Sequence, residues 1–330
     1  MKSEAAPRSV FIAGGTGFVG SALVEKCKQL DLEYCYLTRK SELSSCNSFV
    51  GDLLSLNLLL SAHITSANTF INCSGELSDV PKMRALHVDA AQNLLAILAQ
   101  SRQSNKVLFH WIQLSSCGAY GQAAEHPSIP RYVNENTRGT PSGEYECTKA
   151  EADSLIVDFA QKHDWFKYTI IRPANVFGIG MRSTAIKRIA QMIKNRFFFY
   201  AGNKNAIANF VHVDDLVKAI VLSINQSKAY NQIFLVSNDC KLSDVIDTIA
   251  GALQVPKPGL VINEFLLRKV VILVGSWIKL PISSTQIDVM MRKTYYSNQK
   301  IINVLGWSTS ASVLVQLKQY IDTVFNVKNS

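Results

Sequence analysis

The sequence has few of the features that mark secreted or membrane-spanning proteins. Its seven cysteines are odd in number and form no Cys-x-x-Cys pair, which argues for reduced thiols and against a disulfide framework or a zinc site. The N-terminus reaches glycines after a short apolar run and lacks the hydrophobic region of a signal peptide. The apolar stretch from Val270 to Ile278 is far shorter than the ~20 residues that span a bilayer. We therefore expect a cytoplasmic protein without a membrane span, and a buried helix at this stretch.

Acidic side chains are missing from one long segment. The chain holds 34 Lys and Arg against 25 Asp and Glu, a net charge of +9, and no acid occurs from Lys167 to Val213. A basic surface attracts anions such as nucleic acid, an anionic membrane or a phosphorylated small molecule. The alternative interpretation is an ordinary solvated face. No basic stripe interleaved with aromatic residues appears, so we do not expect a nucleic-acid partner.

Short β-rich runs alternate with helical patterns in the first half of the chain. This alternation predicts βαβ units, and hence an α/β fold with a Rossmann-type, doubly wound parallel sheet. The expected strands cover Ser9–Ala13, Glu33–Thr38, Thr69–Cys73, Val107–Leu114 and Tyr168–Arg172, and the expected helices cover Ser21–Leu30, Asp89–Gln100 and Gly143–Lys162.

Beyond Pro173 the alternation loosens. Helical patterns cover 184–195 and 242–253, strand patterns cover 210–213 and 232–236, and the tail is mostly helical through Val327. The length suggests about two structural units. We expect a dinucleotide-binding Rossmann domain over 1–173 and a smaller, mostly helical substrate-binding region over 174–330. Residues 209–238 are expected to pack back onto the Rossmann domain.

The sequence AGGTGFVG directly follows the first expected strand. Gly15, Gly17 and Gly20 satisfy GxGxxG, and Gly14 with the last two satisfies GxxGxxG. Glycines here permit a tight turn and a close approach of the backbone to a pyrophosphate, which lies on amides at the helix N-terminus. Because the motif stands between a strand and a helix, it predicts dinucleotide binding.

The end of the second expected strand discriminates between the two nicotinamide cofactors. An acid about 20 residues past the glycines binds the ribose 2′-hydroxyl of NAD, whereas an arginine accommodates the 2′-phosphate of NADP. Arg39 and Lys40 occupy this position. The sequence therefore favours NADP over NAD; the alternative is that Arg39 stacks on adenine or faces solvent.

Tyr145 and Lys149 lie four residues apart on the expected helix 143–162, so they share a helix face. A nearby ammonium can lower the pKa of a phenol and make it a base. Ser115 and Ser116 follow the strand that ends at Leu114, at the carboxyl edge where open α/β sheets bind ligands. Together these residues predict a proton-transfer site. Three other pairs have the Tyr/Lys spacing in other contexts: Tyr36/Lys40, Tyr200/Lys204 and Tyr296/Lys300.

Six motifs in register resemble the extended short-chain dehydrogenase/reductase family, also described as the NAD-dependent epimerase/dehydratase family. The resemblance is closest to the branch that acts on nucleotide sugars, and it covers essentially the whole chain. The motifs are AGGTGFVG, GDL at 51–53, SSCGAYG, YECTKAEAD, IRPANVFG at 171–178 and NFVHVDDLVKAI at 209–220, with a similar tail YYSNQKIINVLGW.

The resemblance implies a role for each matching position. The catalytic residues would be Tyr145 as general acid/base, Lys149 as its helper and Ser116 as donor to the substrate oxygen. The cofactor would contact Gly14, Gly17, Phe18, Val19, Gly20, Arg39, Asp52, Leu53, Cys73, Ser74, Gly75, Tyr145, Lys149, Pro173 and Val176. The substrate would contact Ser116, Asn175, Lys187, Arg188, Lys204 and Arg292. No metal site is implied, and the HVDD run at 212–215 would be structural.

The chain departs from the family pattern at three positions. Cys117 and Gly118 stand where dehydratases carry an Asp-Glu pair and decarboxylases a Glu, which argues against 4,6-dehydration and decarboxylation. His87 replaces a frequent Asn, so the proton relay of that position is left open. Ala208 lies near the position of an arginine that grips the substrate diphosphate, for which Lys187, Arg188, Lys204, Arg292 and Lys293 offer substitutes.

These observations predict an NAD(P)-dependent epimerase or 4-keto reductase that acts on a nucleotide-activated sugar, with hydride transfer and Tyr145 as acid/base. Two alternatives stay open at this point. One is a reductase of a non-nucleotide ketone, flavonoid-like or steroid-like, and the other is a non-catalytic NAD(P)-binding protein. A homodimer is expected from the resemblance alone.

Overall fold

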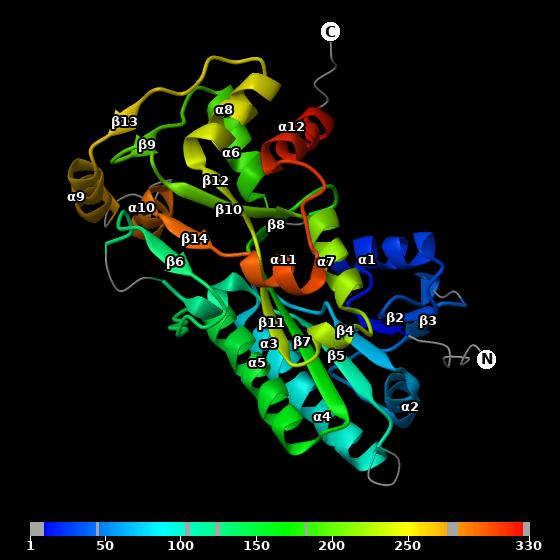
Figure 1. Cartoon of the computed structure of the whole chain (residues 1–330). Helices are drawn as coiled ribbons and strands as arrows, with labels where there is room; N and C mark the ends of the chain where they lie inside the picture. The colour runs from blue at the N-terminus through cyan, green and yellow to red at the C-terminus, as the bar shows by residue number, and fades with distance from the viewer. Residues whose placement is uncertain are drawn as a thin grey trace.

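A seven-stranded parallel sheet forms the lower half of the molecule in Figure 1. This computed structural model describes residues 10–43, 46–102, 106–122, 126–181, 184–275 and 283–325. The spatial order of the strands is β3-β2-β1-β4-β5-β7-β11, and it reverses between β1 and β4 as in a doubly wound sheet. The predicted fold class is confirmed. The strands are β1 (Val10–Ala13), β2 (Tyr34–Thr38), β3 (Ser48–Val50), β4 (Thr69–Asn72), β5 (Phe109–Leu114), β7 (Phe166–Pro173) and β11 (Gln232–Val236).

Helices cover both faces of this sheet because its central strands are apolar on both sides. Val10 and Ile12 pack toward one layer of helices, and Phe11 and Ala13 pack toward the other. The first layer contains α1 (Phe18–Gln29), α7 (Val213–Ser223) and α11 (Gln299–Leu305), and the second contains α2 (Leu58–Ser66), α4 (Ala90–Ser101) and α5 (Glu144–Lys162).

The upper half of the molecule has its own apolar core. It is built from β8 (Asn175–Phe177), β10 (Ile207–His212), β12 (Asn238–Lys241), α6 (Ala185–Lys194), α8 (Leu242–Ala252) and α12 (Val313–Val324). A peripheral group contains β9 (Tyr200–Ala201), β13 (Val261–Ile262), α9 (Glu264–Gly275) and α10 (Ser284–Met291). The last pair of strands is β6 (Arg131–Val133) with β14 (Thr294–Tyr296).

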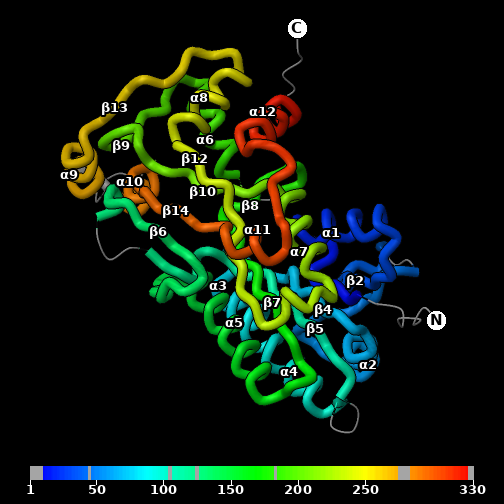
Figure 2. The backbone as a smooth tube through the Cα atoms, in the orientation of Figure 1, coloured from blue at the N-terminus to red at the C-terminus, as the bar shows by residue number. Residues whose placement is uncertain are grey.

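The chain crosses between the two halves several times, as the tube in Figure 2 shows. After β10, helix α7 packs against α1, and β11 then pairs with β7 in the large sheet. Trp307, which follows α11, donates from Nε1 to the carbonyl oxygen of Asp215. The division at residue 173 therefore separates two parts that share contacts, and as a domain boundary it stays a prediction.

Several boundaries differ from the sequence prediction. Helix α1 begins at Phe18, three residues earlier than expected, because the backbone is extended only up to Gly17. The three-residue strands β3 and β14 and the helix α2 were not predicted. Strands this short leave no period-2 pattern to detect. Ser9 and Val327 lie outside the described residues.

The expectation of a buried helix at 270–278 is wrong for the part that the structure describes. Phe265 and Ile272 of α9 are 68% and 69% exposed. The helix lies at the outer edge of the molecule and packs only through its inner side (Figure 1). Among the described residues, no helix is long and apolar enough to cross a membrane. Residues 276–278 lie outside that part of the chain.

Candidate active site

The glycine loop between β1 and α1 is shaped by close backbone contacts. Gly14 has a φ of +75°, and a Cβ there would lie 2.7 Å from the carbonyl carbon of Cys73. A Cβ at Gly20 would overlap the carbonyl oxygen of Gly14. Gly17 is the N-cap of α1, has no side chain to cap the helix, and is followed by a first turn without acidic residues. The first N–H groups of α1 are therefore free to bind a phosphate, and the loop fits the expected dinucleotide.

The segment after β4 lies directly beside this loop. The N–H of Cys73 donates to the carbonyl oxygen of Ala13, 3.0 Å away, and burial raises the pKa of the Cys73 thiol to about 12. Ser74 lies next to Gly14, and a Cβ at Gly75 would lie 3.4 Å from the Nζ of Lys149. The expected cofactor residues of both strand ends thus meet at one edge of the sheet.

Ser116 and Tyr145 are brought together as predicted. Ser116 is the N-cap of the short helix η3 (Cys117–Tyr120), and its Oγ accepts a hydrogen bond of 3.0 Å from the N–H of Gly118. Burial raises the pKa of the Tyr145 phenol above its usual value, and the nearby Ser116 side chain lowers it in part.

Lys149 lies one helical turn after Tyr145, and its ammonium reaches the ends of β4 and β5. Its Nζ donates to the carbonyl oxygens of Leu114 at 3.0 Å and Ser74 at 3.5 Å. Burial lowers the pKa of Lys149 to about 8, and the charge of Asp153 raises it in part. The sequence predicted that Lys149 would lower the pKa of Tyr145, but in this structure burial has the largest effect on the phenol and raises its pKa. The backbone carbonyls hold the ammonium instead.

A buried ion pair between Asp153 and Arg172 lies close enough to Lys149 for the Asp153 charge to affect the pKa of Lys149. Asp153 Oδ2 accepts hydrogen bonds from Ser115 Oγ at 2.7 Å and from Arg172 Nε at 3.0 Å. Burial raises the pKa of the Asp153 carboxyl, while the nearby Arg172 charge lowers it. Ser115 therefore anchors this pair, and of the two serines only Ser116 contacts Tyr145.

His87, whose role the sequence left open, lies next to the catalytic candidates. It belongs to a π-helical turn (Ala85–Asp89) between α3 (Val80–Arg84) and α4. Its Nε2 accepts a hydrogen bond of 3.0 Å from the N–H of Glu76, which places the ring proton on Nδ1. That atom lies 2.9 Å from Thr148 Oγ1, and the His87 ring meets the Tyr145 ring edge-on at 5.7 Å. Burial, together with the Lys149 charge, lowers the pKa of His87 to about 3.

The expected adenine end of the site lies at the carboxyl ends of β2 and β3. Arg39 and Lys40 are both exposed beyond β2. Asp52 accepts a hydrogen bond of 3.0 Å from the N–H of Leu54, and Leu53 is buried in the core. The exposed guanidinium of Arg39 can approach a ligand, whereas Leu53 also serves the packing of the sheet.

Three residues expected to contact the nicotinamide or the substrate lie at the end of β7 and on β8. Pro173 is buried at the end of β7, and Val176 is half-buried in β8. Asn175 is exposed, and its Nδ2 donates to the carbonyl oxygen of Asn209 at 3.0 Å. The side chain is thus oriented by β10, which pairs with β8.

Among the described residues, no hydrogen bond or ring contact joins the four basic side chains that are expected to bind the substrate. Lys187 and Arg188 are exposed on α6, and the Nζ of Lys204 lies 5.0 Å from the centroid of the Tyr200 ring. Arg292 lines a cavity of about 110 Å³. The other residues that line it are Gln122, Pro127, Ile129, Arg131, Asp288 and Thr294.

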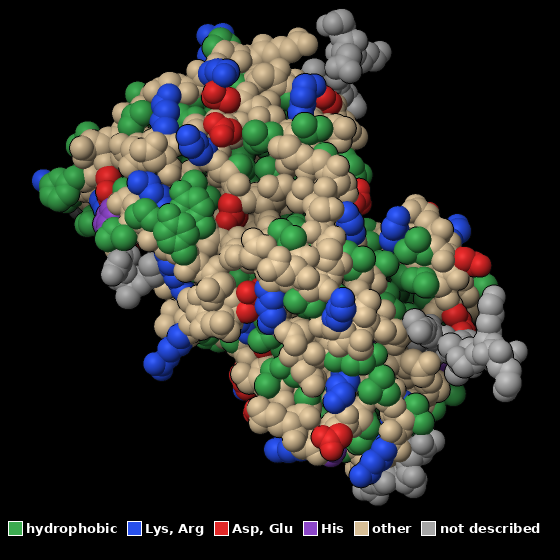
Figure 3. Space-filling view, viewed as in Figure 1, with side chains coloured by type: hydrophobic (Ala, Val, Ile, Leu, Met, Phe, Trp, Pro, Cys, Tyr) green, Lys and Arg blue, Asp and Glu red, His purple; other side chains and the backbone are tan. Residues whose placement is uncertain are grey.

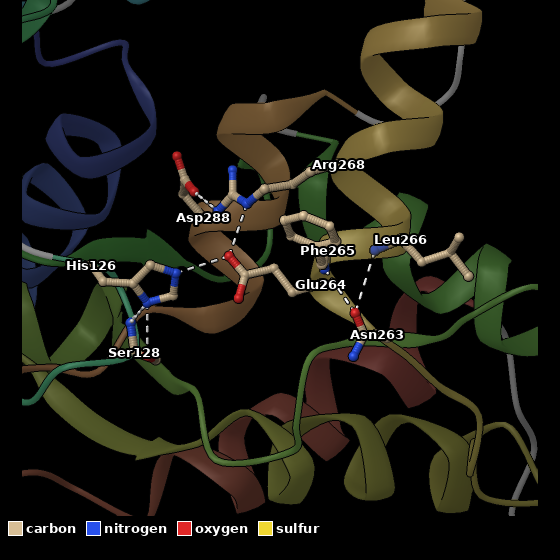
Figure 4. A network of polar contacts seen from close by, with 8 residues as sticks. All are labelled: His126, Ser128, Asn263, Glu264, Phe265, Leu266, Arg268 and Asp288. Atoms are coloured by element: carbon tan, nitrogen blue, oxygen red, sulfur yellow. Dashed lines mark hydrogen bonds and ion pairs between the residues drawn. The ribbon is translucent and has the colours of Figure 1, made fainter.

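Figure 4 shows a polar network that includes Asp288 from the lining of this cavity. His126 Nε2 lies 2.9 Å from Glu264 Oε1, and Arg268 binds both Glu264 and Asp288. The segment at 126–131, α9 and α10 are thereby joined. Asp288 also lines the cavity, so its position beside Arg292 depends on this network.

The HVDD run has structural contacts. His212 caps α7 by accepting from the N–H of Asp214. The buried carboxylate of Asp215 accepts hydrogen bonds from Ser310 and from Gln316. These contacts occupy the Asp215 oxygens and hold the C-terminal part of the chain against α7.

Comparison with known proteins agrees with this geometry. The model of the family described as "NAD dependent epimerase/dehydratase family" matches residues 10–236. The chain belongs to this family. It is an enzyme of the short-chain dehydrogenase/reductase type. A UDP-glucose 4-epimerase from Vibrio cholerae is 26% identical over 263 residues, which cover 76% of this chain and 77% of that protein.

Solved structures share the fold at low sequence identity. MoeE5 in complex with UDP-glucuronic acid and NAD has a TM-score of 0.74 at 19% identity, covering 97% of this chain and 100% of that chain. RMD from Pseudomonas aeruginosa, complexed with NADPH, has a TM-score of 0.67 at 18% identity, with the same coverage of 97% and 100%. These two likenesses show that the chain shares this fold.

Proposed function

We propose that the protein is an NADP-preferring enzyme that epimerises a nucleotide-activated sugar through a 4-keto intermediate, or reduces such a keto sugar. The observation that carries this proposal is the convergence of three side chains beside the glycine loop: Ser116, which lowers the pKa of the buried Tyr145 phenol, and Lys149, which is held at the ends of β4 and β5. The relative named UDP-glucose 4-epimerase and the neighbour with bound UDP-glucuronic acid support this substrate class.

Each of the three side chains has a separate task in this proposal. When bound, the nicotinamide supplies or accepts hydride at a sugar carbon. Tyr145 exchanges the proton of the oxygen on that carbon, and Ser116 donates a hydrogen bond that polarises the same oxygen. Because burial raises the pKa of Tyr145, loss of its proton needs a positive charge nearby, and we propose that Lys149 supplies this charge during the reaction.

The neighbours of Ser116 favour these reactions over dehydration. Cys117 is buried, its Sγ donates to the carbonyl oxygen of Arg172, and burial raises the pKa of the thiol well above its usual value. Gly118 offers no side chain. Neither residue supplies an acid or base for the second proton that 4,6-dehydration moves, whereas 4-epimerisation and keto reduction need Tyr145 alone.

The ends of the site support the cofactor preference and a polyanionic substrate. Arg39 is exposed at the end of β2, where a 2′-phosphate can reach it. Arg292 and Arg131 line the same cavity, which reaches Gln122 just after η3. We assign the substrate diphosphate to Arg292 and keep Lys187, Arg188 and Lys204 as further candidates. Neutralising these three lysine and arginine side chains tests them, because substrate affinity should fall while cofactor affinity stays unchanged.

The decisive experiment combines ligand binding with one tyrosine substitution. We expect thermal stabilisation by NADP, by NAD to a smaller extent, and by at least one nucleotide sugar. Tyr145→Phe should reduce turnover of that sugar by about a hundredfold or more while it still binds the dinucleotide. Tyr320→Phe is the matched control, because Tyr320 is also buried but lies on α12.

Two results would contradict the proposal. Full activity of Tyr145→Phe would remove the catalytic assignment. Turnover of a neutral ketone that is insensitive to added UDP or dTDP would replace the nucleotide sugar by a different substrate class. The proposed homodimer is tested separately by sedimentation velocity.

A further inference from the structure

The outer side of α9 is a broad apolar surface. Leu267 and Val271 pack inward against residues of β9 and α10, whereas the outward side chains are exposed to between 41% and 69%. Neighbouring residues of the β13 segment extend the same surface. We call it the α9 face, and its members are Leu260, Val261, Phe265, Leu266, Val270, Ile272 and Leu273.

Positive charge alone accompanies the α9 face. Lys269 is exposed, its Nζ lies 4.7 Å from the centroid of the Phe265 ring, and it joins none of the ion pairs formed among the described residues. Between Leu260 and Leu273 the only carboxylate is Glu264. It is 23% exposed and points inward, where it pairs with Arg268 and His126 (Figure 4).

The α9 face also projects from the molecule. Helix α9 is the outermost element at the left of Figure 1, and hydrophobic side chains gather at this edge in Figure 3. A projecting helix can meet a planar surface without obstruction by the rest of the chain. The apolar side of a helix can enter the headgroup boundary of a bilayer while a lysine beside it extends its ammonium to the headgroups.

We propose that the α9 face binds the surface of an anionic lipid membrane. Phe265, Leu266 and Ile272 enter the boundary between headgroups and acyl chains, and Lys269 extends its ammonium to the lipid phosphates. The net charge of +9 adds long-range attraction to anionic lipids. The helix lies on the membrane, since no described helix is both long and apolar enough to cross it.

A second copy of the chain fits this face less well. A two-fold dimer places the same patch of both subunits in one interface. The two Lys269 ammonium groups would then enter an apolar contact in which the α9 face offers no carboxylate to either. Anionic lipid headgroups instead neutralise this charge, which is why we assign the face to a lipid surface.

Vesicle co-sedimentation tests the proposal on the full-length protein. The probes are vesicles of phosphatidylcholine and of phosphatidylcholine with phosphatidylglycerol. We expect binding to the anionic vesicles, weaker binding at high salt, and a loss of about a hundredfold in partitioning for the double variant Phe265→Ser with Ile272→Ser. Lys269→Glu should lose binding, and Lys269→Arg should retain it. The matched control is Leu58→Ser with Leu59→Ser, because both leucines are exposed on α2.

The outcomes separate the possible occupants. Thermal melting and turnover without vesicles should be the same for the wild type and the Phe265/Ile272 variant, so that a loss of vesicle binding cannot come from unfolding. Absence of wild-type binding to anionic vesicles overturns the proposal, and so does equal binding by the double variant. If that variant instead converts a dimer into a monomer in sedimentation velocity, the face is a contact between copies and the lipid assignment is wrong.

Discussion

The Nδ1 atom of His87 lies 2.9 Å from the Oγ1 atom of Thr148, across 61 residues of sequence. Thr148 in turn lies 2.9 Å from the carbonyl oxygen of Glu144, in the helix that carries Tyr145 and Lys149. On its other side His87 holds the N–H of Glu76, next to Gly75. One neutral imidazole thus connects the cofactor segment after β4 to the catalytic helix.

This relationship makes His87 a positioning residue for cofactor binding. His87→Ala leaves the N–H of Glu76 without its partner and removes one of the partners of the Thr148 hydroxyl, which costs about 1–3 kcal/mol of stability. We expect the dissociation constant of the dinucleotide, measured by calorimetry, to rise by about tenfold. Lower thermal stability alone would not distinguish this role from a structural one.

His110→Ala supplies the matched control. His110 is also fully buried, and its Nε2 lies 2.8 Å from Thr169 Oγ1, between the inner strands and away from the glycine loop. It should lose stability to a similar degree while its dinucleotide affinity stays at the wild-type value. Equal losses of affinity in both variants would show that His87 acts only through stability.

The same two histidines make the protein sensitive to mild acid. Burial lowers the pKa of both His87 and His110 to about 3, from the usual value of 6.5. Between these values the unfolded state binds more protons than the folded state, so the free energy of unfolding falls as the pH is lowered. Urea unfolding from neutral pH to about pH 5 should show this loss. In His110→Asn the slope of the free energy of unfolding against pH should decrease by the equivalent of up to about one bound proton. An unchanged slope would contradict a buried, neutral His110.

The sequence predicted those parts of the fold that depend on local pattern. Strand β11 was predicted at its observed bounds, 232–236, because a short apolar run with β-branched members favours a strand. Ser116, Tyr145 and Lys149 were found because a motif fixes their place at a strand end and on one helix face.

The features that the sequence did not predict depend on contacts between residues far apart in sequence. The pKa of Tyr145 depends on its burial, and the partners of Lys149 are backbone carbonyls at 74 and 114, neither of which a Tyr/Lys spacing reveals. The outward direction of α9 depends on which side packs against α10. The uncharged run from Val270 to Ile278 carries no signal of its inner side.

Two glycines test the shape of the phosphate loop. In Gly20→Ala the new methyl group overlaps the backbone of Gly14, so the loop must open and dinucleotide affinity should fall by at least about tenfold. Gly251→Ala in α8 meets nothing within 4 Å and should stabilise the protein by about 0.5–1 kcal/mol. Calorimetric binding and thermal melting of both variants check this, and tight binding by Gly20→Ala would contradict the close approach.

The lowered pKa of Lys149 leads us to expect a loss of cofactor affinity at alkaline pH. Its pKa of about 8 means that the ammonium loses its proton as the pH rises through that value, and with it the charge that holds an anionic ligand and its ribose. Dinucleotide affinity should therefore fall above about pH 8, whereas Lys149→Met should bind weakly at every pH. Lys300→Met is the control, because Lys300 has the same spacing from a tyrosine but lies on α11.

Arg39 tests the cofactor preference. Because its guanidinium is exposed at the end of β2, it can pair with a 2′-phosphate, and a carboxylate at the same place would repel that phosphate and bind a ribose 2′-hydroxyl instead. Arg39→Glu should weaken NADP binding by about a hundredfold and strengthen NAD binding. Lys28→Glu makes the same change of charge on the exposed end of α1, so it should leave the ratio of the two dissociation constants unchanged. If both variants shift the ratio equally, net charge rather than Arg39 sets the preference; if neither does, the 2′-phosphate lies elsewhere.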